Sequence, residues 1–208
     1  MTEKRCCCRP SNGQRGLGSA WSYEHTGEEG ILMKLEQGCI QVYTGNGKGK
    51  TTAALGLAFR AVGRGLKVII IQFMKGGGPY GEHAAAERLA PELTIISTGR
   101  PGWVNRESPD PEDVRLARQA LEATREALTG GGYDLVILDE INGAVSFGLL
   151  SVDDLLTLMG EKPPRVELVL TGRNADERVI AAADLVTEMR EIKHYYRAGV
   201  PARIGIEK

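Results

Sequence analysis

The sequence reads Thr44-Gly45-Asn46-Gly47-Lys48-Gly49-Lys50-Thr51-Thr52 at the point that decides its fold. An apolar run at 39–43 precedes this stretch and an alanine- and leucine-rich segment at 53–59 follows it, an order that predicts strand, glycine-rich turn and helix. Glycines allow backbone N–H groups to turn inward around an anion, and the helix N-terminus adds a positive dipole. Lys50 adds a full charge, and the Thr51 hydroxyl can ligate Mg²⁺. The stretch therefore predicts a phosphate-binding loop.

The loop departs from the usual eight-residue phosphate-binding pattern at one position. That pattern places a glycine five residues before Gly49, where this chain has Thr44. Its glycines fall instead at 45, 47 and 49. The binding of phosphate is still expected, although this one position does not fit the usual pattern.

The rest of the chain alternates apolar strands with helices. Strands are expected at 67–73, 93–97, 134–140 and 166–171, with an edge strand at 184–190. Helices are expected from 53 to about 64, at 110–129 and at 151–159, and another after Arg173 with Asn174 as its N-cap. This alternation predicts a three-layer α/β/α sandwich around a mainly parallel sheet.

Two acids, Asp139 and Glu140, end the fourth expected strand. Four apolar residues precede them, as in the second, metal-binding element of nucleotide triphosphatases. A carboxylate at this edge of the sheet could hold the Mg²⁺ that Thr51 contacts. The alternative is that both acids are solvated residues at a strand end.

Three further residues are candidates for ligand binding. Glu82 follows a glycine-rich loop at a strand end, although a lone glutamate is commonly a surface acid. Arg173 follows the fifth expected strand and could clamp a phosphate. Trp103 lies in a loop with glycine and proline, either as a platform for a flat ligand or as an anchor packed on the body.

Composition limits the classes of protein that fit. The chain has 208 residues, 42% of them hydrophobic, which suits one globular domain over 36–208. Its net charge of −1 gives no general attraction to nucleic acid or to an anionic membrane. Because we find no apolar run of about 20 residues and no apolar signal core, we expect a cytoplasmic protein.

Residues 1–35 show no apolar periodicity, so we expect a flexible N-terminal arm. One hypothesis is that translation naturally starts at Met33 and that the residues before it are not native. The competing hypothesis is a functional arm that closes over an active site.

The motifs together resemble the P-loop corrinoid adenosyltransferases. The resemblance covers residues 36–208 and rests on the stretches 41–54, Gln72-Phe73, Lys75-Gly76, Gly81-Glu82, 138–140, 171–173, 183–188, 193–194 and 198–200. It implies a P-loop NTPase-like, RecA-like fold. Loops of the form Gly-Asn-Gly-Lys-Gly-Lys-Thr are specific to this family, which accounts for Thr44.

The resemblance implies adenosyl transfer, with Co(I) of a reduced corrinoid attacking C5′ of ATP and triphosphate leaving, in cobalamin synthesis or salvage. It implies Mg²⁺ held by Thr51 and Glu140, and catalytic roles for Lys50, Glu140 and Arg173. It also implies a reduced flavoprotein as electron donor and a homodimer. The residues expected to bind ATP or the corrinoid are Gly45, Asn46, Gly47, Lys48, Gly49, Lys50, Thr51, Thr52, Glu82 and Trp103.

One position departs from some members of that family. They carry two aromatic residues spaced by one in the loop after the third strand, which press on the lower face of the corrin. Trp103 fits the first, but Asn105 occupies the second. The preferred corrinoid therefore stays open, between complete cobalamin and a precursor.

Two other functions fit a phosphate-binding loop on this fold. One is an ATP hydrolase of the RecA type that is coupled to a partner or to nucleic acid. The other is a nucleotide-dependent regulatory binder. The phosphate product distinguishes adenosyl transfer from hydrolysis, because adenosyl transfer releases triphosphate and hydrolysis releases orthophosphate.

Overall fold

The computed structural model of this protein describes residues 34–78 and 80–207. The expected N-terminal arm lies almost entirely outside these residues. The strands are β1 (Ile40–Thr44), β2 (Val68–Gln72), β3 (Leu93–Ser97), β4 (Leu135–Asp139), β5 (Glu167–Thr171) and β6 (Leu185–Glu188). The helices are α1 (Lys50–Val62), α2 (Gly81–Arg88), α3 (Pro111–Thr129), α4 (Ile141–Ser146), α5 (Val152–Gly160), α6 (Glu177–Ala182) and the 3₁₀ helix η1 (Tyr195–Ala198).

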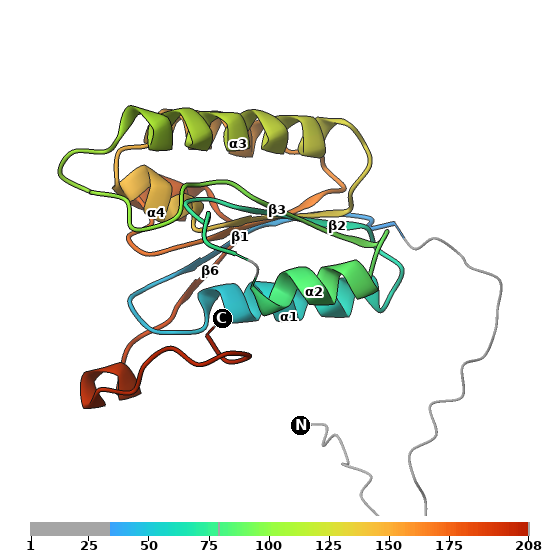
Figure 1. Cartoon of the computed structure of the whole chain (residues 1–208). Helices are drawn as coiled ribbons and strands as arrows, with labels where there is room; N and C mark the ends of the chain where they lie inside the picture. The colour runs from blue at the N-terminus through green and yellow to red at the C-terminus, as the bar shows by residue number, and fades with distance from the viewer. Residues whose placement is uncertain (1–33, 79, 208) are drawn as a thin grey trace, which may run out of the picture. The chain divides into compact units, whose positions relative to one another are not determined.

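The strands form one sheet in the order β3-β2-β4-β5-β1-β6, with every neighbouring pair parallel. Strands β2 and β4 are buried at all five of their positions, because helices cover both faces of the sheet there. Figure 1 shows α3 and α4 on one face and α1 and α2 on the other. The predicted three-layer α/β/α fold is confirmed.

Alternate residues of the central strands supply two separate cores. Ile71 and Leu138 pack on the side of α3 and α5, whereas Ile70 and Ile137 pack on the side of α1 and α2. A parallel sheet places the carboxyl ends of all its strands at one edge, where such folds hold their ligands. The loops that follow β1, β2, β3, β4 and β5 therefore meet there.

Helix α3 begins where the sequence predicts. The Asp110 carboxylate accepts a hydrogen bond of 2.8 Å from the Glu112 N–H, and Pro111 is the first helical residue. The predicted capping box of α5, between Ser151 and Asp154, is also present. The cap residues therefore explain where both helices begin.

The predicted start of α6 is wrong. Asp176, and not Asn174, caps this helix by accepting a hydrogen bond from the Arg178 N–H. Asn174 instead has a left-handed backbone with φ of 54°, within the turn that leaves β5. Asparagine tolerates that conformation better than most residues, so its role is in the turn and not in the helix.

The loop between β3 and α3 is fixed to the body at Arg100. This side chain forms ion pairs with Asp110 and Asp113 at 2.9 and 2.8 Å. Hydrogen bonds from Arg100 hold the pKa of Asp113 below its usual range. The base of the loop that carries Trp103 is thereby tied to the first turn of α3.

Candidate active site

The phosphate-binding loop, Gly45–Gly49, connects β1 to α1 at the carboxyl edge of the sheet. Gly49 is the N-cap of α1, and no side chain in the described part of the chain caps this helix. The first turn also carries no acidic residue. Because backbone N–H groups of the first turn lack partners within the helix, this end is suited to bind an anion.

The glycines of the loop are required by the chain that passes beside it. Gly45 has φ of 94°, and a Cβ atom there would lie 2.5 Å from the Met189 carbonyl oxygen. The Gly47 N–H donates a hydrogen bond of 2.7 Å to the same carbonyl oxygen. The loop is therefore held against the segment that follows β6, and a side chain at Gly45 would prevent this contact.

The presence of threonine at position 44 also has a structural reason. It is buried at the end of β1, and its hydroxyl accepts a hydrogen bond of 3.2 Å from the Ala175 N–H. A glycine could not make this contact. The threonine that departs from the usual pattern thus ties the phosphate loop to the turn after β5.

Lys50 lies beneath the loop and is only 6% exposed. Its ammonium donates hydrogen bonds of 2.8 and 2.7 Å to the carbonyl oxygens of Gly45 and Gly47. Burial lowers the pKa of Lys50, while the Glu140 carboxylate opposes that change and Arg173 adds to it. The loop therefore encloses a cationic side chain whose charge an incoming phosphate would stabilise.

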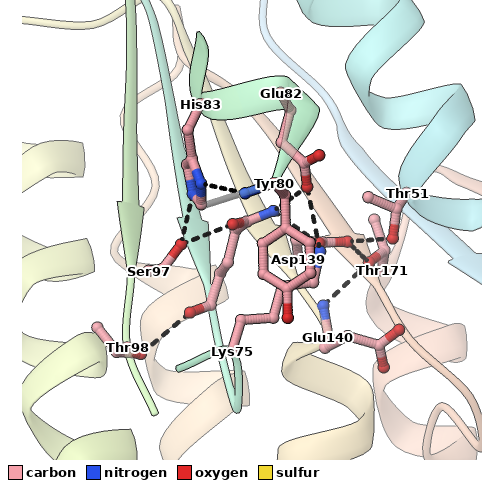
Figure 2. Close-up of polar contacts among 11 residues, drawn as sticks. Thr51, Lys75, Tyr80, Glu82, His83, Ser97, Thr98, Asp139, Glu140 and Thr171 are labelled. Carbon is pink, nitrogen blue, oxygen red and sulfur yellow. Dashed lines mark hydrogen bonds and ion pairs between the residues drawn. The ribbon is translucent and has the colours of Figure 1, made fainter. Parts of the chain in front are cut away.

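Asp139 is the hydrogen-bonded centre of the site and is 1% exposed. One of its oxygens accepts the hydroxyl protons of Thr51 and Thr171, at 2.8 and 2.7 Å. The other lies 2.7 Å from the Lys75 ammonium. Figure 2 shows these three side chains around Asp139. The acid that contacts Thr51 directly is thus Asp139, the last residue of β4.

Glu140, the next residue, is placed differently. Its backbone is left-handed, with φ of 64°, and its N–H donates to the Thr171 hydroxyl at 3.0 Å. Within residues 34–78 and 80–207, its carboxylate makes no hydrogen bond or ion pair. Burial raises the pKa of Glu140, and the Asp139 charge adds to this effect. A shielded carboxylate without a partner cation fits the ligand set of Mg²⁺, together with the Thr51 hydroxyl.

Four further predicted residues divide into two groups by their relation to a polar cavity. Asn46 and Arg173 line a polar cavity of about 430 Å³ beside the loop, together with Glu188, Arg190, Glu191 and Arg197. Lys48 and Thr52 do not join this cavity. Lys48 forms an ion pair of 3.4 Å with Glu207, and Thr52 is exposed on α1.

Glu82 and Trp103 have opposite environments. Glu82 accepts a hydrogen bond of 3.1 Å from the Gln72 amide and lies 3.6 Å from the Lys75 ammonium, so it is not a solvated surface acid. Trp103 is fully exposed in the loop before α3, so the interpretation of Trp103 as a packed anchor is wrong. Its role as a platform stays a prediction.

Sequence reasoning gave no role to Gln72, Lys75, His83 or Ser97. All four lie at or after the carboxyl ends of β2 and β3, and their polar atoms connect to Asp139 or to one another. Their position at the ligand-binding edge of the sheet was the available signal. The contacts themselves join segments that are distant in sequence and follow from no local pattern.

The fold and the loop define a nucleotide-binding protein of the P-loop NTPase-like class. Residues 36–207 match the family described as ATP:corrinoid adenosyltransferase BtuR/CobO/CobP, and the chain belongs to this family.

Curated relatives that are named corrinoid adenosyltransferase are similar to this chain over most of their length. The Escherichia coli K12 corrinoid adenosyltransferase is 40% identical over 174 residues, which are 83% of this chain and 86% of the relative. The Pseudomonas aeruginosa corrinoid adenosyltransferase is 37% identical over 172 residues, 83% of this chain and 84% of the relative. The Salmonella typhimurium corrinoid adenosyltransferase CobA is 37% identical over 174 residues, 83% and 86% of the two chains.

The predicted enzyme class is confirmed by this membership. The chain is a transferase of cobalamin synthesis, with ATP as co-substrate and a corrinoid as the acceptor. Among the described residues, no helix has the length and apolar character needed to span a membrane.

Proposed function

We propose that this protein transfers the 5′-deoxyadenosyl group of ATP to the Co(I) centre of a reduced corrinoid, with triphosphate as the leaving group. The cobalt electron pair forms the bond to C5′, and the C5′–O bond breaks with its electron pair moving to the bridging oxygen. Cobalt becomes formally Co(III). The step needs no general acid or base, because triphosphate leaves as an anion. The protein must neutralise that anion and hold C5′ in line with cobalt.

The phosphate loop carries this proposal. An uncapped α1 N-terminus lies next to the buried Lys50 ammonium, so backbone N–H groups and a full positive charge are available to one anion. We assign the loop, Gly45 to Thr52, to the triphosphate. Lys50 would stabilise the negative charge that grows on it as the C5′–O bond breaks.

Thr51 and Glu140 would hold Mg²⁺. The Thr51 hydroxyl proton is directed at Asp139, which leaves the oxygen lone pairs available to a cation, and the Glu140 carboxylate has no cationic partner among the described residues. When bound, the ion would neutralise part of the leaving-group charge. Lys75 supplies a further fixed charge, because Asp139, Glu82 and Glu140 raise its pKa even though burial alone would lower it.

The arginine-rich cavity beside the loop would receive the remainder of the substrates. The guanidinium groups of Arg173 and Arg190 suit phosphate or carboxylate groups, while that of Arg197 is paired with Glu191 at 2.6 Å. We place Arg173 beside the nucleotide and Trp103 beside the corrin, since a fully exposed indole offers a flat apolar surface. The residue two positions after Trp103 is Asn105, so Trp103 would be the one aromatic of this pair to contact the corrin.

The proposed reaction consumes Co(I), so an electron donor must supply it. We propose a reduced flavoprotein as donor and a homodimer as the working form, both on the family resemblance, and a cytoplasmic location on the sequence pattern. Size-exclusion chromatography with light scattering tests the dimer directly, and a mass of one chain would contradict it.

Incubation with ATP, Mg²⁺ and chemically reduced cobalamin tests the proposed function. We expect the absorption change of a cobalt–carbon bond, and one triphosphate formed for each corrinoid alkylated. Omission of either the corrinoid or ATP should abolish both signals. Release of orthophosphate without a corrinoid would instead favour the RecA-type ATP hydrolase.

A further inference from the structure

A chain of hydrogen bonds runs from the first turn of α2 to the centre of the site. The Tyr80 N–H donates to His83 Nδ1 at 3.0 Å, so the neutral imidazole carries its proton on Nε2. His83 Nε2 lies 2.9 Å from Ser97 Oγ, and the Ser97 hydroxyl donates to Gln72 Oε1 at 2.7 Å. Each donor thus has one acceptor, and the direction of the chain is fixed. Figure 2 shows His83 and Ser97 on one side of the network and Asp139 on the other.

Gln72 connects this chain of hydrogen bonds to the carboxylates of Glu82 and Asp139. Its side chain is fully buried, and its amide nitrogen lies 3.1 Å from Glu82 Oε1 and 3.4 Å from Asp139 Oδ2. An inverted amide would present its carbonyl oxygen to two carboxylates. The Ser97 hydroxyl, directed at Gln72 Oε1, favours the orientation in which the amide donates to both acids.

The orientation of Asp139 matters because its carboxylate fixes the side chains that donate hydrogen bonds to it. One oxygen accepts from Thr171 and from Thr51, which lies in the first turn of α1 beside the phosphate-binding loop, and the other accepts from Lys75, in the loop after β2. If the Gln72 amide rotated, Asp139 would lose a donor and gain freedom to move. The Thr51 hydroxyl and the Lys75 ammonium would then lose their fixed positions beside the triphosphate.

We propose that His83 and Ser97 are positioning residues for the transfer step: through Gln72 they fix Asp139, and through Asp139 they fix Thr51 and Lys75. This inference rests on the proposed function, since it assumes that triphosphate leaves from this loop. Neither residue needs to contact a substrate. Their effect is on the preorganisation of the groups that meet the leaving group.

Ser97 gives a clean test, because it is exposed at the carboxyl end of β3 and fills no core volume. Ser97→Ala removes the hydroxyl, and Ser97→Thr retains it in a residue suited to a strand. We expect Ser97→Ala to lower kcat about tenfold with the KM for the corrinoid unchanged, and Ser97→Thr to restore most of the activity. The thermal midpoint of both variants should stay within about 2 °C of the wild type.

A second measurement does not depend on turnover. Titration calorimetry with inorganic triphosphate and Mg²⁺ should show binding to Ser97→Ala weakened about fivefold, with Ser97→Thr like the wild type. His83→Leu should reproduce the loss, and the double variant Ser97→Ala/His83→Leu should lose no more than either single variant, because both interrupt one chain.

The outcomes distinguish failure of the proposed function from failure of the positioning role of His83 and Ser97. Wild-type protein that formed no triphosphate would contradict the proposed function, while the calorimetric comparison would still decide the role of Ser97. Turnover in the wild type together with equal triphosphate binding and equal kcat in Ser97→Ala would overturn the positioning role. Additive losses in the double variant would overturn it as well.

Discussion

Replacing Lys50 by alanine should lower kcat/KM for adenosyl transfer by about 10³-fold. The ammonium is nearly buried and lies within hydrogen-bonding distance of two loop carbonyl oxygens, so the variant loses both a charge and the support of the loop. Since the leaving triphosphate gains negative charge in the transition state, most of the loss should fall on kcat. Rates are best measured from the absorption change of the reduced corrinoid.

Lys67→Ala is the matched control for this variant. Lys67 is exposed and directly precedes β2, at the amino end of the sheet and away from the loop. Its replacement should change kcat/KM less than about twofold. A Lys50→Ala enzyme with wild-type kcat/KM would remove the phosphate loop from the mechanism.

Glu140→Gln should lower kcat/KM by about 10²-fold and raise the Mg²⁺ concentration needed for half-maximal rate. The substitution keeps the shape of the side chain and removes the charge of a carboxylate that has no cationic partner among the described residues. A titration of rate against Mg²⁺ at saturating ATP measures the effect. Glu122→Gln, at an exposed position on α3, is the control and should follow the wild-type titration.

Asp139→Asn distinguishes the two adjacent acids. Asp139 already accepts from Thr51, Thr171 and Lys75, so its replacement should reduce stability and rate together. If Glu140→Gln followed the wild-type Mg²⁺ titration and Asp139→Asn shifted it, the metal ligand would be Asp139 and the assignment of Glu140 would be wrong.

Much of the fold could be predicted from local patterns. The continuous β-branched run of β2 predicts a strand buried on both faces, and Asp110 with Pro111 marks the start of α3. Helices α2 and α4 were not predicted, because they have only eight and six residues and show too little apolar periodicity. Asn174 was misplaced because asparagine serves turns as readily as caps.

The candidate site also has features that could be predicted from local sequence and features that could not. The loop at 44–52 is contiguous, so its phosphate-binding role could be read from the sequence. The contact of Thr51 with Asp139 spans 88 residues, and that of Gln72 with Asp139 spans 67, so neither could be derived without the placement of α1 and β2 against β4. Asp139 and Glu140 also looked equivalent as a pair. Their separation accompanies the left-handed backbone of Glu140: among the described residues Asp139 accepts from Thr51, Thr171 and Lys75, whereas the Glu140 carboxylate has no such partner.

The central claim is that the bond between C5′ and oxygen breaks and that the whole triphosphate leaves. ATP carrying ¹⁸O at the oxygen between C5′ and the α-phosphorus tests this most directly, with reduced corrinoid as acceptor and mass spectrometry of the products. We predict that all of the ¹⁸O is recovered in triphosphate and none in a nucleoside or nucleotide. Recovery of the label in ADP or AMP, with release of orthophosphate or pyrophosphate, would show cleavage at phosphorus and contradict the proposed mechanism.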